Sequence, residues 1–168
     1  IAPQNARKRV LVPSATVGGR WRIDPAFDDS AWKTVDGGAG GIGYEIESGY
    51  ESLISLDVQD EMYDPNDNGL TSCFIRIPFQ ITAEQLPRIK TLLLHVYYDD
   101  GFVAWINGFQ AAGANSPESL TWESVALGNH EAETREIFNI SSSIENLKVG
   151  ANLLAIHAMN VHSHSSDF

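Results

Sequence analysis

The stretch YYDDGFVAWINGF, residues 97–109, decides the fold, because it places two turn signals inside an alternating apolar pattern. The segment Asp99–Gly101 fits a three-residue hairpin loop, in which the glycine takes the left-handed conformation. The dipeptide Asn107–Gly108 is the strongest short signal for a two-residue hairpin. The sequence therefore predicts three consecutive antiparallel strands, with a turn at each of the two signals.

Both predicted hairpins put the same side chains on the same face of the sheet. This agreement specifies the register, because a shift of one residue would move every side chain to the other face. The late segment Asn152–Asn160 alternates in the same way. The predicted core face consists of Leu92, Leu94, Val96, Ala104, Ile106, Phe109, Ala111, Leu154, Ile156 and Ala158. The opposite, outer face carries His95, Tyr97, Trp105 and Gln110.

The rest of the chain is built in the same way, from short runs of β-branched and aromatic residues separated by turn signals. Such a pattern is typical of an all-β sandwich or barrel. A length of 168 residues suits a single domain, residues 1–168. Two short helical turns are expected at Thr82–Gln85 and Ser142–Glu145, which have capping-box spacing, and Gly150 is expected to end the second.

Composition argues against several classes of partner. The net charge is −11 and the 11 Lys and Arg residues are scattered, so nucleic acid is not expected as a partner. No apolar run approaches the roughly 20 residues of a membrane span, so membrane insertion is not expected either. No signal peptide is visible in the first residues. The single cysteine, Cys73, excludes an internal disulfide and is expected to be a small buried residue.

Four segments, in this order, resemble the galactose-binding-like β-sandwich. They are FDDSAW (27–32), FIRIPF (74–79), YYDDGFVAWING (97–108) and IFNISSSIENLKVGANLLAIHAMN (137–160). The pattern is similar to that of the sugar-binding accessory domain of family 2 glycoside hydrolases. The final SSDF (165–168) is similar to the end of related modules in large secreted bacterial proteins.

The resemblance implies an antiparallel two-sheet jelly roll that is non-catalytic and is excised from a larger bacterial protein, extracellular or at the cell surface. It implies a polysaccharide or glycan as ligand, neighbouring domains of the longer chain as partners, and often a structural calcium ion. The long acidic insertion at 37–69 departs from the family pattern, and nothing in the sequence marks the catalytic barrel of the family 2 enzymes.

Two surfaces are candidates for ligand binding. On the outer face of the sheet, Trp105 has a flat apolar ring flanked by His95, Tyr97 and Gln110, which suits a pyranose ring. Alternatively, the N-terminal segment or the long loop covers this face and buries Trp105 with Trp21 or Tyr50. The second surface is the sandwich edge, where the loop at 113–135 can meet the acidic turn. Its candidate residues are Asp99, Asp100, Asn115 and Trp122, with His130 nearby.

The two adjacent carboxylates have a simpler explanation as well. Aspartate is favoured in hairpin turns, so Asp99 and Asp100 can be turn residues without a chemical role.

A metal site is suggested by the segment DPNDNG, residues 64–69, which begins like a calcium-binding loop. The position of the bidentate glutamate is occupied by Ile75, so an EF-hand is excluded, and a turn rich in Asn and Asp is the alternative. The oxygen-bearing residues of a different cage are Asp57, Asp60, Asp64, Asn66 and Asn68. His157, His162 and His164 lie near the end of the chain but lack further ligands that would complete a zinc site.

The remaining motifs do not indicate a cofactor site or a catalytic site. The segment GAGGIG, residues 38–43, matches a dinucleotide-binding pattern formally, but no buried strand precedes it and no helix follows, so a flexible loop is expected. No nucleophile elbow or zinc-protease motif is present.

Three functional hypotheses follow. A glycan-binding module predicts exposed aromatic side chains in a groove. A structural or adhesion module that docks neighbouring domains predicts a covered Trp105. A small glycan hydrolase predicts a carboxylate pair in a cleft.

Overall fold

A six-stranded antiparallel sheet forms the centre of the computed structural model, which describes all 168 residues. Its strands in spatial order are β2 (Lys33–Val35), β1 (Lys8–Leu11), β5 (Ser72–Ile81), β10 (Gly150–Met159), β7 (Gly101–Ile106) and β8 (Phe109–Ala114). Two strand pairs make a second layer: β3 (Gly41–Gly43) with β4 (Ile54–Asp57), and β6 (Leu93–Val96) with β9 (Glu136–Asn139). The expected all-β sandwich is confirmed.

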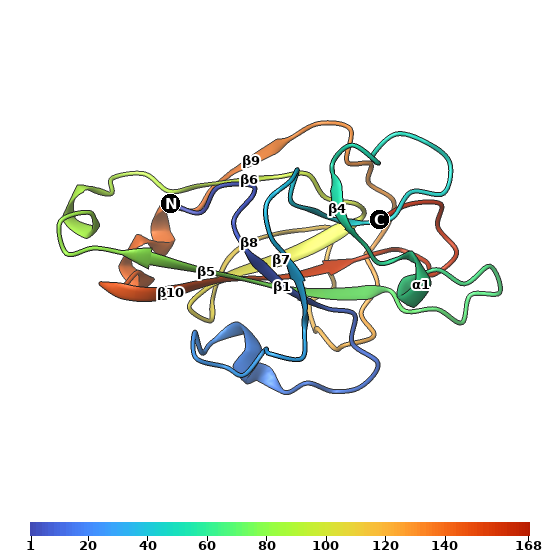
Figure 1. Cartoon of the computed structure of the whole chain (residues 1–168), viewed down its shortest axis with the longest axis horizontal. Helices are drawn as coiled ribbons and strands as arrows, with labels where there is room; N and C mark the ends of the chain where they lie inside the picture. The colour runs from blue at the N-terminus through green and yellow to red at the C-terminus, as the bar shows by residue number, and fades with distance from the viewer.

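The central sheet is covered on both faces. In Figure 1, β6 and β9 pass along one side of β5 and β10, and the blue segment that includes η1 (Gly19–Arg22) lies on the other side. The side toward η1 contains an aromatic cluster around Trp21, Trp32, Phe74 and Trp105. The opposite side contains two further apolar clusters, one under β6 and one near β3 and β4. The β7 strand is buried along its whole length because it lies between these layers.

Both expected helical turns are present. The backbone N–H of Thr82 donates to Gln85 Oε1 at 2.9 Å, and the N–H of Gln85 donates to Thr82 Oγ1 at 3.2 Å, as a capping box requires. The short helix η2 (Leu86–Arg88) follows, and η3 spans Ser141–Asn146. The remaining helix, α1, spans Gln59–Met62.

The hairpin predicted at Asn107–Gly108 is also confirmed. Both residues have positive φ, of 51° and 89°, as a type I′ turn requires. Ile106 pairs with Phe109 and Trp105 with Gln110, as predicted, but Ala104 pairs with Ala112 instead of Ala111. The cause is a register shift after Trp105, where one extra residue is accommodated in β8.

The hairpin predicted at Asp99–Gly101 is wrong. The β6 strand pairs with β9, and β7 pairs with β10 and β8, so the chain crosses from one layer to the other at this point. Gly101 does not have the positive φ that the predicted turn requires. Asp99 and Asp100 are buried at the crossing instead of exposed at a hairpin tip.

The predicted core face is right in part. Leu94, Ala104 and Ile106 belong to one buried cluster, although their strands face each other across the sandwich instead of pairing. Phe109 is 59% exposed, because β8 is an edge strand that extends beyond the second layer. On β10, the opposite set of side chains is the more buried one, so Leu154 and Ile156 are only half-buried.

The glycine-rich segment 38–43 ends in a packed strand instead of forming a flexible loop throughout, and only residues 38–40 are irregular. Gly41 and Gly43 lie in β3, which pairs in parallel with β4. A Cβ atom at Gly41 would collide with the Leu53 carbonyl, and one at Gly43 would collide with the Phe168 carbonyl. The glycines therefore allow close backbone approach.

Several residues of the recognised motifs hold the fold together. Arg76 of β5 is 1% exposed, and its Nε lies 2.7 Å from Asp29 Oδ2. Asn107 donates through Nδ2 to Asn152 Oδ1 at 2.9 Å, joining the β7–β8 turn to the start of β10. These contacts link segments that are distant in sequence.

Candidate functional site

A cavity of about 600 Å³ opens between the central sheet and the second layer. Its walls are mostly apolar and include Ile75, Ile77 and Phe79 of β5, Leu154, Ile156 and Ala158 of β10, and residues 91–98 of the β6 region. The half-buried state of Leu154 and Ile156 follows from their position on this wall. The polar and aromatic lining residues include Tyr50, His95, Tyr97, Asp99 and Arg135.

The β6 strand supplies an aromatic and a hydrogen-bonding side chain beside this cavity. Tyr97, just beyond β6, is 41% exposed, and His95 is also exposed. His95 pairs with Ile137 of β9, and the exposed Arg135 lies just before that strand. Tyr97 and His95 were both predicted as ligand contacts, and the structure brings them together at the cavity.

A group of three carboxylates lies at one edge of the sandwich. Ligand oxygens of Asp99, Glu131 and Asp167 all lie within 4.8 Å of one another. Asp99 is buried at the crossing between layers, Asp167 is half-buried near the C-terminus, and Glu131 is exposed on the loop at 113–135. One metal ion could be held by the three side chains together.

The electrostatics of this group are unfavourable for three free carboxylates. Burial, together with the neighbouring charges of Asp167, Asp100 and Glu131, raises the pKa of Asp99 to about 8. Burial and the charges of Glu131 and Glu45 likewise raise the pKa of Asp167.

Neighbouring contacts fix the position of two of these carboxylates. The hydroxyl of Tyr50 donates to Glu131 Oε2 at 3.1 Å, linking the loop at 37–69 to the loop at 113–135. The backbone of Asp167 forms an isolated β-bridge with that of Glu45, and its carbonyl accepts from Asn160 Nδ2 at 2.9 Å.

Asp100 has a structural role and is not part of this group. Its Oδ1 accepts from the His130 N–H at 2.7 Å and its Oδ2 from the Val161 N–H at 2.8 Å. Asn115 donates through Nδ2 to the Asp100 carbonyl at 3.0 Å. The His130 ring stacks on Tyr98 at 4.0 Å between centroids. The predicted edge residues thus do converge, but Asp100 and Asn115 use their polar groups within the protein.

Trp105 does not offer an exposed platform on the outer face. Its residue is 5% exposed, and its ring meets Trp21 edge-on at a centroid distance of 6.0 Å. The alternative, in which the N-terminal segment covers this face and buries Trp105 with Trp21, is the one observed. Gln110 is exposed on β8, and Trp122 is half-buried against the aromatic cluster.

The predicted oxygen cage in the loop at 57–68 does not form. Asp57 Oδ1 accepts from the Gln59 N–H at 2.8 Å, and Asp64 Oδ1 accepts from the Asn66 N–H at 2.7 Å. Asn68 likewise donates to the Asn66 carbonyl at 3.1 Å, while Asp60 is exposed and joins no metal-binding group. These are local turn contacts, so the alternative of an Asn- and Asp-rich turn is the better account.

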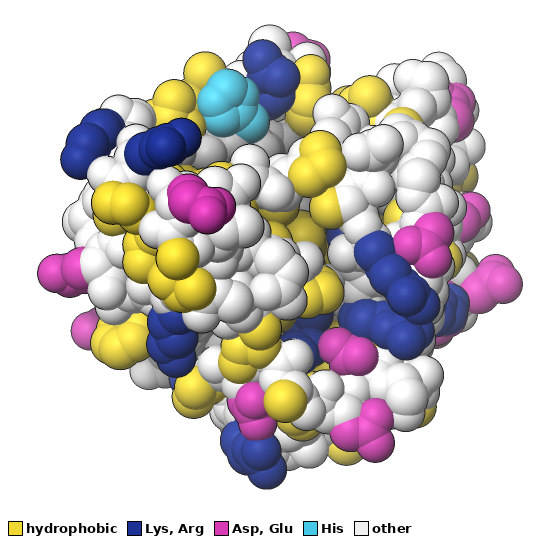
Figure 2. Space-filling view, turned by 60° about the vertical axis from the view of Figure 1, so that its left-hand side comes forward, with side chains coloured by type: hydrophobic (Ala, Val, Ile, Leu, Met, Phe, Trp, Pro, Cys, Tyr) yellow, Lys and Arg dark blue, Asp and Glu magenta, His cyan; other side chains and the backbone are white.

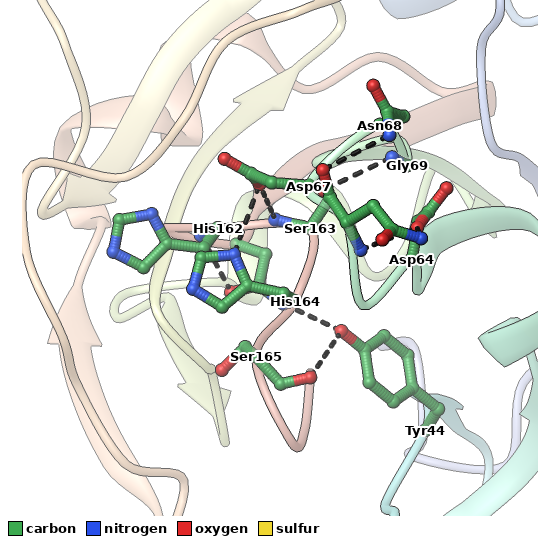
Figure 3. Close-up of polar contacts among 11 residues, drawn as sticks. Tyr44, Asp64, Asp67, Asn68, Gly69, His162, Ser163, His164 and Ser165 are labelled. Atoms are coloured by element: carbon green, nitrogen blue, oxygen red, sulfur yellow. Dashed lines mark hydrogen bonds and ion pairs between the residues drawn. The ribbon is translucent and has the colours of Figure 1, made fainter.

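The same loop contacts the C-terminal histidines. Figure 3 shows Asp67 joined to Ser163, with the rings of His162 and His164 side by side. Asp67 Oδ1 accepts from Ser163 Oγ at 2.8 Å and lies 3.2 Å from His164 Nδ1. This contact anchors the end of the chain to the loop.

His157 is separate from the other two histidines and is buried in β10. Its Nε2 lies 2.7 Å from Ser72 Oγ, and its ring meets Phe74 edge-on. Burial, with a smaller contribution from the charge of Arg22, lowers the pKa of His157 to about 4.

We expect this burial to make stability depend on pH. The folded pKa is depressed below the unfolded value near 6.5, so the stability contributed by neutral His157 is present above pH 6.5 and is lost as pH falls toward 4. The difference in unfolding free energy between wild type and His157→Gln should shrink by about 2 kcal/mol from pH 7 to pH 5. Urea denaturation of both proteins at both pH values measures it, and a constant difference would contradict the assignment.

Sequence reasoning missed Glu131 and Asp167 as partners of Asp99. The three residues are far apart in sequence and lie in irregular segments, where no periodicity relates one side chain to another. The only available signal was the location of Asp167 in the SSDF segment and of Glu131 in a long loop.

Comparison with known proteins supports the fold. No family model and no curated protein matches the sequence. Among solved structures, a calcium-binding mutant of β-glucuronidase 2 from Bacteroides uniformis matches with a TM-score of 0.57 at 16% identity, over 94% of this chain and 14% of that one. A family 2 β-glucuronidase matches with a TM-score of 0.55 at 14% identity, over 93% and 13%. A family 2 enzyme from Bacteroides cellulosilyticus matches with a TM-score of 0.54 at 15% identity, over 95% and 17%.

The chain thus resembles an accessory domain of family 2 glycoside hydrolases and spans about one seventh of the length of the first of these enzymes. On the face drawn in Figure 2, basic, acidic and apolar side chains are intermixed. None of the helices has the length and apolar character needed to cross a membrane.

Proposed function

We propose that this chain is a non-catalytic carbohydrate-binding module that recognises a polysaccharide or glycan as an accessory domain of a larger protein. The proposal includes an extracellular or cell-surface location and neighbouring domains in the same longer chain. The resemblance to a small part of family 2 glycosidases supports a carbohydrate-related accessory role. The binding of a particular glycan is part of the proposal.

The observation that carries the proposal is the open cavity between the two layers, here called the groove beside β6. Tyr97, His95 and Arg135 lie beside it. A partly exposed tyrosine offers a flat apolar ring for a sugar face, and the hydroxyl, imidazole and guanidinium groups can bond to sugar hydroxyls. An apolar pocket with a few polar groups that fix orientation is the usual form of a ligand site. This site replaces Trp105 as the aromatic platform.

The small share of the enzymes that the chain matches disfavours a glycosidase. The chain covers only 13% of a family 2 β-glucuronidase, which fits an accessory domain. The ligand oxygens of the acidic group all lie within 4.8 Å of one another, so the group could hold one cation.

A second candidate function is docking of a neighbouring domain. The covered Trp105 agrees with this hypothesis, and the β6–β9 pair exposes Leu93 and Ile137. Apolar side chains at the surface beside an apolar cavity suit a protein partner as well as a sugar.

A calcium ion also belongs to the proposed module. The resemblance implies one, and a similar fold occurs in the calcium-binding mutant of the Bacteroides uniformis enzyme. The ion is proposed to be structural, since its ligands would come from segments that are distant in sequence.

A glycan array probed with the chain, followed by calorimetry on the highest-ranked oligosaccharide, tests the binding function. Tyr97→Ala should weaken binding by about thirtyfold, because truncating a central aromatic contact typically costs at least about 2 kcal/mol. Phe109→Ala, which removes an exposed aromatic ring from the distant β8 edge, is the matched control and should leave affinity unchanged. Equal affinities in wild type and Tyr97→Ala would contradict the site, and an array without binding would favour the docking function.

A further inference from the structure

One face of the central strand β10 is less buried than its position in the sheet would require. The strand is the fourth of six, and on the face toward η1 its side chains Leu153 and Ala155 are completely buried. On the face toward the second layer, Leu154, Ile156 and Ala158 are only half-buried. Side chains at the centre of a sandwich are normally close-packed. Apolar surface at the centre of this sandwich instead lines the groove beside β6.

The floor of the groove is a continuous apolar surface built from two paired strands. Leu154 of β10 pairs with Ile77 of β5, and Ile156 pairs with Ile75. All four residues line the groove, whose volume is about 600 Å³. Small-molecule sites measure about 300–1,000 Å³, whereas one water molecule takes roughly 30 Å³ of the liquid. The groove is therefore large enough for an organic ligand, and its floor offers that ligand only apolar contacts.

The polar lining residues lie at one end of the groove. Tyr97 and Asp99 follow the end of β6, and Arg135 lies just before β9, whose first residue pairs with the last residue of β6. Phe79 and Ile106 line the other end, where they belong to an apolar cluster. The two ends correspond to the ends of β7, which begins shortly after Asp99 and finishes at Ile106. The groove is thus polar at one end and apolar along its floor and at the other end.

This distribution decides which chemical group the floor can accept. A sugar ring carries hydroxyls on most of its carbons. Against the floor these hydroxyls would lose their hydrogen bonds to water and gain no partner in the protein. An alkyl chain or an aromatic ring has no such groups, and its burial against the same surface is favourable.

We propose that the floor of the groove binds the apolar group of an amphiphilic ligand, an alkyl chain or an aromatic ring attached to a sugar. The apolar group lies against β5 and β10, and the sugar lies at the end that carries Tyr97. The identity of the head group rests on the proposed function, whereas the apolar group is inferred from the walls of the groove alone. The N-terminal segment does not cover the floor in its place, because Ile1 at the rim is 63% exposed.

The test measures by calorimetry the binding of octyl β-D-glucopyranoside below its micelle-forming concentration, of methyl β-D-glucopyranoside and of 1-octanol. Both octyl compounds should bind, with the negative heat-capacity change that burial of apolar surface produces. Methyl glucoside should bind at least about a hundredfold more weakly than octyl glucoside, because it lacks the methylene groups that the floor would bury.

Ile156→Trp places a larger apolar side chain on the floor and should weaken the binding of both octyl compounds at least about tenfold. Because the added ring extends into the groove, it should not lower the unfolding temperature. Ile137→Trp is the matched control: it makes the same change on the exposed face of β9, outside the groove, and should keep the wild-type affinity.

A measurement on wild type makes the test independent of how the variant folds. Nuclear Overhauser effects should connect the octyl chain with the methyl groups of Ile77, Leu154 and Ile156. Failure of both octyl compounds to bind would overturn the proposal, as would contacts of the chain with Leu93 and Ile137 alone. Concentration-dependent shifts of the Leu154 and Ile156 methyl groups without ligand would also overturn it, because they would assign the groove to a second copy of the chain.

The three probes separate this proposal from the proposed function. If 1-octanol and octyl glucoside bind equally and no glycan on the array binds, the apolar site stands and the glycan-binding function fails. If a glycan from the array binds and neither octyl compound does, the glycan-binding function stands and the apolar site is wrong.

Discussion

Replacing Arg76 with methionine should lower the unfolding free energy by about 3–5 kcal/mol, the range observed when one partner of a buried ion pair is removed. The guanidinium Nε lies 2.7 Å from Asp29 Oδ2, and the other nitrogens donate to the carbonyls of Trp21 and Asp24. The ring of Phe27 lies 5.2 Å from the guanidinium carbon. Methionine fills much of the same volume but leaves Asp29 Oδ2 and the Trp21 carbonyl without the donors that Arg76 supplies.

The matched control is Arg20→Met, which breaks an exposed ion pair. Arg20 Nη2 lies 2.5 Å from Asp24 Oδ2, but the arginine side chain is 79% exposed. Such surface pairs contribute about 1 kcal/mol or less. Urea denaturation of the two variants and wild type measures both effects. Equal losses in the two variants would show that the buried pair does not join the N-terminal segment to the sheet.

Replacing Trp105 with alanine should also destabilise the chain by about 3–5 kcal/mol, the usual cost of truncating a buried tryptophan. Its ring packs against Trp21 in the aromatic cluster, and the guanidinium carbon of Arg22 lies 5.0 Å from the ring centroid. The cavity left behind would be lined by residues of several segments, which cannot all move to fill it. Glycan affinity of the folded fraction should not change.

The control for this variant is Phe109→Ala, four residues along the same hairpin. Phe109 is 59% exposed, so its loss should change the unfolding free energy by no more than about 0.5 kcal/mol. If Trp105→Ala proved as stable as Phe109→Ala but lost glycan binding, the outer-face platform would be right and the buried assignment wrong.

Local patterns were sufficient to predict part of this fold. The type I′ turn at Asn107–Gly108 and the capping box at Thr82 depend only on residues that are close in sequence, and both are present. The order of motifs indicated the fold through its resemblance to the galactose-binding-like β-sandwich. Two of these motifs contact each other in the structure, through the ion pair of Asp29 and Arg76.

Non-local pairing was not predictable from the same patterns. The segment Asp99–Gly101 has the composition of a hairpin turn, but Asp100 binds the backbone at His130 and Val161, and β6 pairs with β9. Alternation also distinguishes two faces without showing which one is covered. In this sheet both faces are covered, so Trp105 is buried with Trp21, which is one of the two alternatives that the alternation left open.

In the candidate site, too, the features that depend on local sequence were predicted and those that depend on distant segments were not. Tyr97 and His95 were predicted from strand alternation, which is local, and they lie beside the cavity, with His95 on β6 and Tyr97 just beyond it. The acidic group depends on three segments whose distance in space no local pattern specifies. Only its buried member, Asp99, had been considered a candidate.

The central claim is that a glycan binds in the groove beside β6. The most direct measurement is the change in amide chemical shifts of the ¹⁵N-labelled chain, saturated with calcium and titrated with the highest-ranked oligosaccharide from the array. The account predicts that the largest shift changes occur at His95, Tyr97 and Arg135, with little change at Gln110. Shift changes centred on Gln110 and β8, or none at any residue, would contradict it.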